Sequence, residues 1–233
     1  LNILLVGLLA GVIAYLLGSI SFSILFTKLF AHRQDIRSMG SGNAGTTNVL
    51  RSVGAKAAAF TFIFDFAKGI LAVFIGRLLF TWMTTFTTIE LGAGELVQYG
   101  AYIAGFCCAI GTFPIFFGFK GGKGVLTSWA IIALIDWRAF VVGDYRFYHR
   151  VSLQQIVSLA SICAGSSFPI FTLILNSMIT YIKAPLQAHN VVYVVFSVVI
   201  AALQASILVY KHRANIQRLR AGEEKKITVK KKG

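Results

Sequence analysis

Residues 103–117 read IAGFCCAIGTFPIFF, and residues 118–125 continue as GFKGGKGV. The first segment is apolar enough to enter a membrane, whereas the second sets two lysines among four glycines. Glycines bring backbone N–H groups close to an anion and lysine adds positive charge, so this junction predicts a phosphate site at a membrane surface. The motif is not the nucleotide P-loop, because Gly124 follows Lys123 where that loop has Ser or Thr.

The composition is that of a polytopic membrane protein. Of the 233 residues, 57% are hydrophobic and 13% are charged, against about 45–50% and about 25% in soluble domains. The first apolar run is longer than the core of a cleaved signal peptide, so we expect a retained helix there. The three cysteines lie in apolar runs, which predicts small core residues and no disulfide or metal framework. We expect an all-α membrane protein without a large soluble domain.

The net charge of +14 is concentrated in a few segments. Nine of the 22 Lys and Arg residues follow Tyr210, and another cluster lies within residues 31–56, whereas residues 78–119 contain none. Because basic loops tend to stay in the cytoplasm, we expect residues 31–56, the GFKGGKG loop and the tail on the cytoplasmic side. The acidic segment 84–95 is expected to face outward.

Six segments are long and apolar enough to be candidate membrane spans: residues 3–27, 57–80, 97–117, 125–142, 156–182 and 190–210. Pro169 is a candidate kink in the fifth of them. Six crossings would leave the basic tail outside the cell, against the charge rule.

The segment 143–155 decides how the tail returns to the cytoplasm. It contains Asp144, Arg146 and Arg150, so hydropathy alone predicts a loop. We nevertheless predict a seventh helix through residues 138–155, with its charges facing the bundle or near its ends. The protein would then have about seven transmembrane helices, an outside N-terminus and a cytoplasmic C-terminus. The alternative is that residues 125–142 re-enter the membrane without crossing it.

A second loop has the composition of an anion site. Residues 40–51 read GSGNAGTTNVLR and combine glycine N–H groups with hydroxyl and amide side chains and the guanidinium of Arg51. The alternative interpretation is a flexible loop. Two such loops on one membrane face favour the anion site.

Two other polar groups recur at helical spacing. His212, Asn215 and Arg218 can share one face of a helix at the start of the tail, although such a basic helix is also typical of a lipid anchor. Asp65 and Lys68 are spaced for an ion pair within a membrane helix. We expect this pair to support the residues of the site without contacting the substrates.

The segments GSGNAGTTNVLR, FPIFFGFKGGKGV and HRANIQRLRAGEE resemble the three motifs of the bacterial acyl-phosphate:glycerol-3-phosphate acyltransferases. GSISF near Gly18 and FDFAKG at residues 64–69 fit the same family, so the resemblance spans most of the chain. Three features depart from the family pattern. Thr112 stands where the family usually has His, Ser21 stands where it usually has Pro, and residues 143–155 are apolar in most relatives.

The resemblance implies transfer of a fatty acyl group from acyl phosphate to the 1-hydroxyl of glycerol 3-phosphate, giving lysophosphatidic acid. It places the enzyme in the bacterial inner membrane, with its site at the cytoplasmic face. Since the donor is already activated, two adjacent anion sites suffice, and no metal, cofactor or covalent nucleophile is needed. In the family the substrate's own phosphate takes the hydroxyl proton, so no protein base is required.

The matched motifs assign the catalytic residues Ser41, Arg51, Lys123, His212 and Asn215. They assign the phosphate- and substrate-binding residues Gly40, Gly42, Asn43, Gly45, Thr47, Asn48, Lys120, Gly121, Gly122 and Gly124. Which loop takes which phosphate stays open. We expect one membrane domain over residues 1–210 and a basic cytoplasmic tail over 211–233, in which 211–224 carries the third motif and 225–233 is disordered.

The expected partners are acyl phosphate, glycerol 3-phosphate, anionic lipid headgroups and the enzyme that supplies acyl phosphate, without nucleic acid. Two other functions compete with this one. A transporter or anion exporter would also have glycine-broken helices and buried cations, but typically at the bilayer midplane and in paired halves. An inactive relative acting as a membrane partner is the second, favoured by the missing His.

Overall fold

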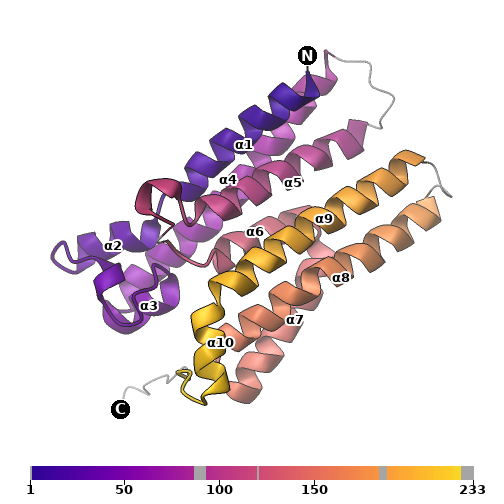
Figure 1. Cartoon of the computed structure of the whole chain (residues 1–233). Helices are drawn as coiled ribbons and strands as arrows, with labels where there is room; N and C mark the ends of the chain where they lie inside the picture. Colours follow the sequence, from indigo (N-terminus) through magenta and orange to yellow (C-terminus); the bar gives the residue numbers. More distant parts are fainter. Residues whose placement is uncertain (1, 87–92, 120, 184–187, 227–233) are drawn as a thin grey trace. The chain divides into compact units, whose positions relative to one another are not determined.

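A computed structural model describes residues 2–86, 93–119, 121–183 and 188–226 (Figure 1). The predicted site residue Lys120 and most of the segment expected to be disordered, residues 227–233, lie outside the described residues. Every regular element within the described ranges is a helix, which confirms the predicted all-α class. The helices are α1 (Ile3–Ser19), α2 (Phe22–Phe30), η1 (Ile36–Ser38), α3 (Thr46–Ser52), α4 (Ala55–Thr84), α5 (Ala93–Gly111), η2 (Ile115–Phe117), α6 (Val125–Ile135), α7 (Trp137–Gln154), α8 (Val157–Lys183), α9 (Ala188–Lys211) and α10 (Arg213–Arg220).

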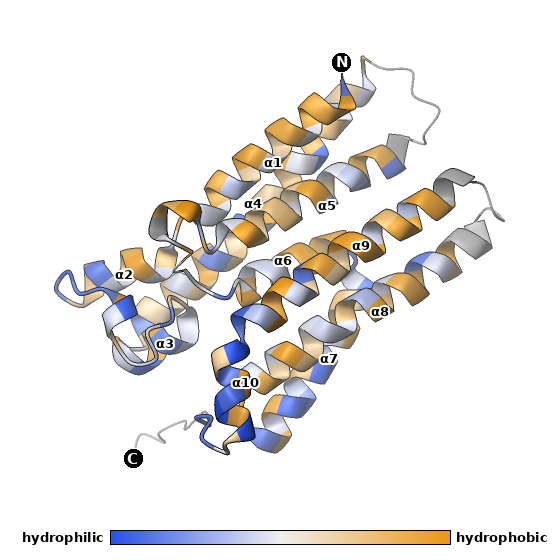
Figure 2. Cartoon of the chain, viewed as in Figure 1, coloured by the Kyte–Doolittle hydropathy of each residue, from blue (hydrophilic) through white to orange (hydrophobic). Residues whose placement is uncertain are grey.

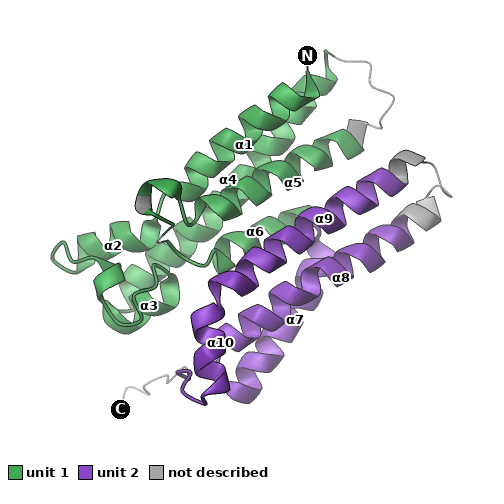
Figure 3. Cartoon of the chain, in the orientation of Figure 1, with its two compact units in different colours: residues 1–135 green, residues 136–233 purple. Residues whose placement is uncertain are grey.

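The chain forms two compact units, Leu1–Ile135 and Asp136–Gly233 (Figure 3). The first unit contains the two glycine-rich loops, and the second contains the third motif. A single membrane domain over residues 1–210 stays a prediction.

Four helical segments of the described chain are long and apolar enough to cross a membrane: Ile3–Phe30, Ala55–Thr84, Val157–Ile179 and Val191–Lys211. Figure 2 shows hydrophobic residues along most of the length of α1 and α9, and a hydrophilic α10. Helix α6 is apolar but has only 11 residues. At 1.5 Å per residue it is about 16 Å long, roughly half the thickness of the hydrocarbon core.

The first unit is a bundle in which α4 and α5 both pack against α1. A β-carbon on Gly100 of α5 would lie 2.5 Å from the carbonyl oxygen of Gly76 on α4, so glycine permits this close approach of the helices. Buried Ala14, Val73 and Ile131 contribute to the core beside them. The core holds α6 on the bundle and so fixes the start of α6, where the GGKG loop ends.

The predicted span 3–27 is interrupted. Helix α1 ends at Ser19 and α2 begins at Phe22, because Ile20 and Ser21 have extended backbone angles. The ammonium of Lys68 donates to the carbonyl oxygen of Ile20 at 2.9 Å and satisfies one acceptor that the break exposes. The break lies in the GSISF segment, where Ser21 replaces the proline of the family.

Two predicted span boundaries are wrong. The predicted span 97–117 ends as an α-helix at Gly111, and Ile115–Phe117 form a separate 3-10 turn. The predicted span 125–142 ends at Ile135, since the carboxylate of Asp136 accepts from the N–H groups of Arg138 and Ala139 and starts a new helix. Arg77 of α4 donates to the carbonyl oxygen of Leu134 at 2.6 Å and caps the end of α6.

The second unit pairs α8 with both α7 and α9. The helix predicted through residues 138–155 is confirmed as a helix, α7, although hydropathy alone predicts a loop over 143–155. Helix α7 is not among the four apolar segments of membrane-spanning length. Pro169 lies inside α8, which continues through it from Val157 to Lys183. A buried hydrogen bond of 2.9 Å from the Asn176 amide to the Ser197 hydroxyl joins α8 to α9.

Candidate active site

The first glycine-rich loop is organised around the side chain of Asn48 on α3. Its amide nitrogen lies 2.9 Å from the carbonyl oxygen of Met39, 3.1 Å from that of Asn43 and 3.3 Å from that of Ile36. Its amide oxygen accepts from the N–H of Ser41 at 3.0 Å. One buried amide therefore holds four points of the loop, and these bonds occupy the group that was predicted to bind phosphate.

The predicted ligands of this loop are more open to solvent than Asn48. Ser41 and Arg51 are exposed, whereas Asn43 and Thr47 are partly buried. Arg51 lies in the last turn of α3. The guanidinium of Arg51 and the hydroxyl of Ser41 thus lie at the surface of the loop. The hydrogen bonds of Asn48 pair several backbone groups beneath them.

Thr46 is a residue that the sequence analysis left out of the site. Its hydroxyl oxygen is buried and forms no hydrogen bond with the described part of the chain. Buried hydroxyl groups usually have a partner, so Thr46 is a candidate contact for a ligand or a water molecule. Its place beside Thr47 in the motif gave no reason to choose one hydroxyl over the other.

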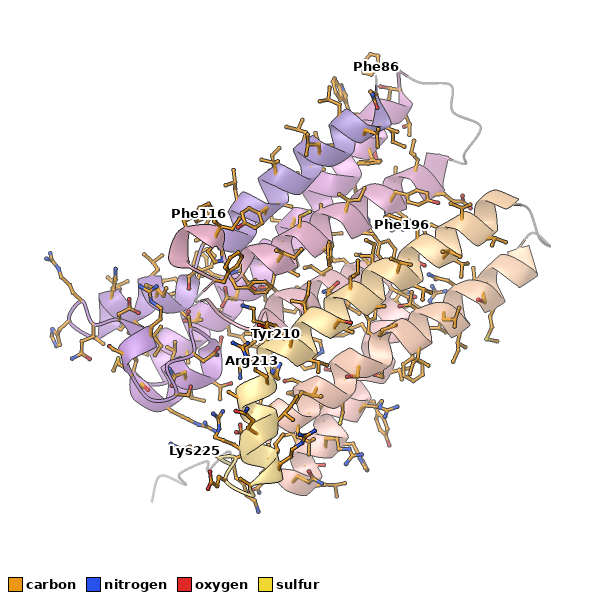
Figure 4. The ribbon with its side chains drawn as sticks, in the orientation of Figure 1. Phe86, Phe116, Phe196, Tyr210, Arg213 and Lys225 are labelled. Carbon is orange, nitrogen blue, oxygen red and sulfur yellow. The ribbon has the colours of Figure 1, made fainter. Side chains whose placement is uncertain are left out.

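The second loop follows the 3-10 turn η2. The N–H of Ile115 donates to the Tyr15 hydroxyl at 3.0 Å, and the ring of Phe116 packs edge-on against the Tyr15 ring at a centroid distance of 6.1 Å (Figure 4 labels Phe116). The N–H of Gly122 donates to the carbonyl oxygen of Thr112 at 3.1 Å. Gly124 has a φ of +69°, which an L-residue rarely adopts, and α6 begins at the next residue.

Gly122 is the point at which the two loops meet. A β-carbon there would lie 2.6 Å from the carbonyl oxygen of Ala44, in the middle of the first loop. Lys123, the next residue, is partly buried. The first unit therefore brings together the two glycine-rich motifs, which are separated by about 75 residues in the sequence.

A buried ion pair supports these loops from α4. The carboxylate of Asp65 lies 2.7 Å from the ammonium of Lys68, which confirms the pair expected from their spacing. The carbonyl oxygen of Asp65 accepts from the hydroxyl of Thr127, at the start of α6, at 3.1 Å. Together with the Lys68 bond to Ile20, these contacts connect α4 to the α1–α2 break and to the helix that follows the GGKG loop.

The third motif lies in the second unit, where α9 passes into α10. His212 is 2% exposed, and its Nδ1 lies 2.8 Å from the carbonyl oxygen of Leu208, so Nδ1 carries the hydrogen in this contact. Arg213 stacks over the ring of Tyr210 at 4.5 Å, as Figure 4 shows at the junction of the two helices. His212 and Asn215 are both buried.

Glu224 is the centre of this motif and was not predicted as a site residue. Its carboxylate accepts from the Asn215 amide at 2.6 Å, the Ser158 hydroxyl at 2.8 Å and the Arg218 guanidinium at 2.7 Å. Asn215 and Arg218 thus share one helix face, as their spacing predicted. The signal for Glu224 was its place inside the matched segment HRANIQRLRAGEE, but spacing alone does not distinguish it from Glu223.

The contacts of Glu224 change its acidity. Burial raises the pKa of this carboxyl, but the hydrogen bonds from Asn215, Arg218 and Ser158 outweigh burial and hold the pKa below its usual value. The carboxylate is therefore ionised at neutral pH. It neutralises Arg218 and fixes the amide of Asn215.

These features define a class: an integral membrane protein with two glycine-rich loops in contact and a polar, carboxylate-centred motif. The family model for glycerol-3-phosphate acyltransferase matches residues 8–222. A glycerol-3-phosphate acyltransferase of Syntrophomonas wolfei is 38% identical over 220 residues, covering 94% of this chain and 96% of its own. One from Carboxydothermus hydrogenoformans is 35% identical and covers 97% and 99%.

Solved structures agree with the sequence relatives. The chain is similar to the crystal structure of PlsY (YgiH), an integral membrane glycerol 3-phosphate acyltransferase, in its glycerol 3-phosphate form, with a TM-score of 0.71 and 30% identity. That match covers 95% of this chain and 96% of the PlsY chain. This chain belongs to the glycerol-3-phosphate acyltransferase family, as its motifs predicted.

Proposed function

We propose that the protein transfers a fatty acyl group from acyl phosphate to the 1-hydroxyl of glycerol 3-phosphate, releasing lysophosphatidic acid and inorganic phosphate. The observation that carries this proposal is the contact of the GGKG loop with the first loop, where Gly122 lies against Ala44. Two phosphorylated substrates need two anion sites within reach of one another, and this contact brings together the two loops that are proposed to bind anions. A PlsY structure with glycerol 3-phosphate and one in a lysophosphatidic acid form support the acceptor and the product.

The two loops are assigned complementary roles. In the second loop, Gly121, Gly122 and Gly124 let one phosphate approach the backbone closely, and Lys123 and Lys120 supply the positive charge that binds it. In the first loop, Arg51 binds the other phosphate with Ser41, Asn43 and Thr47, and Gly40, Gly42 and Gly45 let the backbone approach it. Asn48 holds this loop in shape through its own hydrogen bonds rather than contacting phosphate.

The chemistry follows from the activated donor. The 1-hydroxyl oxygen attacks the acyl carbonyl carbon, a C–O ester bond forms, and the bond from the acyl carbon to the phosphate oxygen breaks. The hydroxyl proton passes to a phosphate oxygen of the substrate, and the electron pair leaves with inorganic phosphate. Lys123 and Arg51 stabilise the negative charge that builds up on the transferring group, while His212 and Asn215 bind or orient a substrate.

The decisive experiment supplies the purified protein with palmitoyl phosphate and labelled glycerol 3-phosphate and measures lysophosphatidic acid. We expect activity to persist in EDTA and palmitoyl-CoA to be a poor donor. Lys123→Ala and Gly122→Val should each reduce turnover at least about tenfold, which equals 1.4 kcal/mol in the transition state, whereas Lys231→Ala should have almost no effect. Absence of product would favour an inactive relative, and equal loss in Lys231→Ala would make the loop a headgroup anchor.

We also propose the predicted topology: about seven crossings in the bacterial inner membrane, an outside N-terminus and the site at the cytoplasmic face. The cationic tail and loops carry this proposal. The alternative, in which α6 re-enters without crossing, leaves the tail inside as well, so the turn before α7 distinguishes the two. In a background without the native cysteines, Trp137→Cys should react with an impermeant thiol reagent in intact cells and Lys232→Cys should not. Protection of Trp137→Cys would favour re-entry.

A further inference from the structure

The second half of α7 presents a cationic–aromatic face made of Tyr145, Arg146, His149 and Arg150. All four are exposed, and Tyr145 is 70% accessible. Phe147 and Val151, in the same turns, are partly buried, and α7 packs against α8. This face lies outside the three motifs and has no role in the reaction proposed above.

The charges of this face have no carboxylate partner in the described chain. The ion pairs of the second unit there are Asp136–Arg138 and Arg218–Glu224, and neither includes Arg146 or Arg150. These two arginines are four residues apart, where like charges on a helix repel each other. An anion between them would convert this repulsion into two favourable contacts, since each guanidinium can donate two hydrogen bonds to a phosphate.

The face lies at the end of α7 that meets the tail. The Ser158 hydroxyl, just beyond the α7–α8 turn, donates to Glu224 in the tail at 2.8 Å. At 1.5 Å per residue, Arg150 and Arg146 are about 6 and 12 Å from Gln154 at the end of α7. Long arginine side chains at such depths extend toward the headgroups, where tyrosine rings also prefer to lie. This step rests on the cytoplasmic orientation of the tail proposed above.

We propose that the cationic–aromatic face binds the phosphate headgroup of an anionic phospholipid, such as phosphatidylglycerol, in the cytoplasmic leaflet. Arg146 and Arg150 share the phosphate, and the ring face of Tyr145 contacts the glycerol backbone and the first acyl carbons. The ring of Tyr145 already stacks on that of His149, at a centroid distance of 6.0 Å. The exposed rings favour a lipid over free phosphate, which would use only the cations.

The test compares lipid retention by variants with equal charge. The protein is placed in nanodiscs of mixed phosphatidylglycerol and phosphatidylcholine, and the lipids kept per protein molecule are counted by native mass spectrometry. Arg146→Gln/Arg150→Gln should lower the preference for phosphatidylglycerol by more than about tenfold, since each cation near the surface contributes roughly fivefold. Arg146→Lys/Arg150→Lys should retain most of it. The control Arg33→Gln/Lys56→Gln removes two exposed charges from the first unit and should change it less than about threefold.

Three outcomes would overturn the proposal: an unchanged preference in the glutamine pair, an equal loss in the control, or full displacement of the lipid by millimolar inorganic phosphate. If the glutamine pair fails to insert, Arg150→Gln alone should still lower the preference about fivefold, and no change there would also contradict it. Acyl transfer is measured in parallel on the same nanodiscs. A protein without acyl transfer that still prefers phosphatidylglycerol would count against the proposed function alone.

Discussion

The two polar regions of this protein are organised by opposite means. In the first loop, the neutral amide of Asn48 bonds almost entirely to backbone groups, including Ser41 and Met39. In the third motif, the carboxylate of Glu224 collects side chains, namely those of Ser158, Asn215 and Arg218. The first region is therefore organised by the hydrogen bonds of a neutral side chain, whereas the second is organised by those of an ionised one.

This difference suits what each region has to bind. A carboxylate at the centre of the first loop would repel the phosphate that Arg51 is proposed to bind, so a neutral amide is the better organiser there. In the third motif, Glu224 neutralises Arg218 and fixes the buried amide of Asn215. We infer that the cations that act on phosphate lie in the glycine-rich loops, where the backbone is not organised by a carboxylate.

The largest effect is expected where the two glycine-rich loops meet. Gly122→Ala places a β-carbon 2.6 Å from the backbone oxygen of Ala44, and backbone cannot rotate away as a side chain could. We expect turnover to fall by at least about tenfold, because the two anion sites are pushed apart. Gly143→Ala on α7 is the control, since its β-carbon meets nothing within 4 Å and turnover should stay within about twofold. Similar turnover in both variants would mean that the loop contact does not matter.

Asn48→Ala tests whether the first loop depends on its neutral organiser. The change removes one of two donors from each of the carbonyl oxygens of Ile36, Met39 and Asn43, which keep a backbone N–H partner. It also removes the acceptor of the Ser41 N–H, and an unpaired group of this kind costs about 1–3 kcal/mol. We expect the thermal unfolding midpoint to fall by several degrees and turnover to fall with it. Ser52→Ala removes only a 3.4 Å bond to the same amide and should have a much smaller effect. Equal effects of the two changes would make Asn48 an ordinary loop residue.

Some features of these regions could be predicted from the sequence, and others could not. The motif spacing was enough to find both loops, and the Asp65–Lys68 pair follows from a local spacing of three residues. The sequence did not predict that α6 ends at Ile135. This end depends on Arg77, which is distant in the chain and caps the carbonyl oxygen of Leu134. Glu224 was missed for the same reason, since Ser158 is 66 residues distant from it. The Asp65–Lys68 pair could be predicted from helical spacing, whereas the contacts between distant helices and the hydrogen bonds of Asn48 within its own loop could not.

A smaller effect, dependent on pH, is expected in the region held by charge. The pKa of Glu224 is lower in the folded protein than in the unfolded chain, where it is about 4.5. The ionised Glu224 therefore stabilises the fold at a pH above the unfolded pKa. This stabilisation is lost as the pH falls through the folded pKa. Glu224→Gln should therefore lower the unfolding midpoint at pH 7, and the difference from the unchanged protein should shrink as the pH falls below about 4.5. Glu223→Gln, at an exposed neighbour, should show no such trend. A difference that is constant with pH would contradict the charge-based organisation.

The smallest effect is expected from an ion pair at the edge of the first loop. Asp35 and Arg37 form a bond of 2.7 Å, but their side chains are 29% and 34% exposed. The hydrogen bond from Arg37 holds the pKa of Asp35 below its usual value, so this contribution is also lost only under acidic conditions.

Because exposed pairs contribute about 0–1 kcal/mol, Asp35→Asn should change the stability at pH 7 by less than about 1 kcal/mol and the turnover by less than about threefold. The asparagine can still accept the N–H of Arg37 that the aspartate accepts at 2.9 Å. The measurement is the unfolding midpoint of Asp35→Asn beside that of Asn48→Ala. If Asp35→Asn cost as much as Asn48→Ala, the first loop would be held by charge after all, and the contrast with the Glu224 region would be lost.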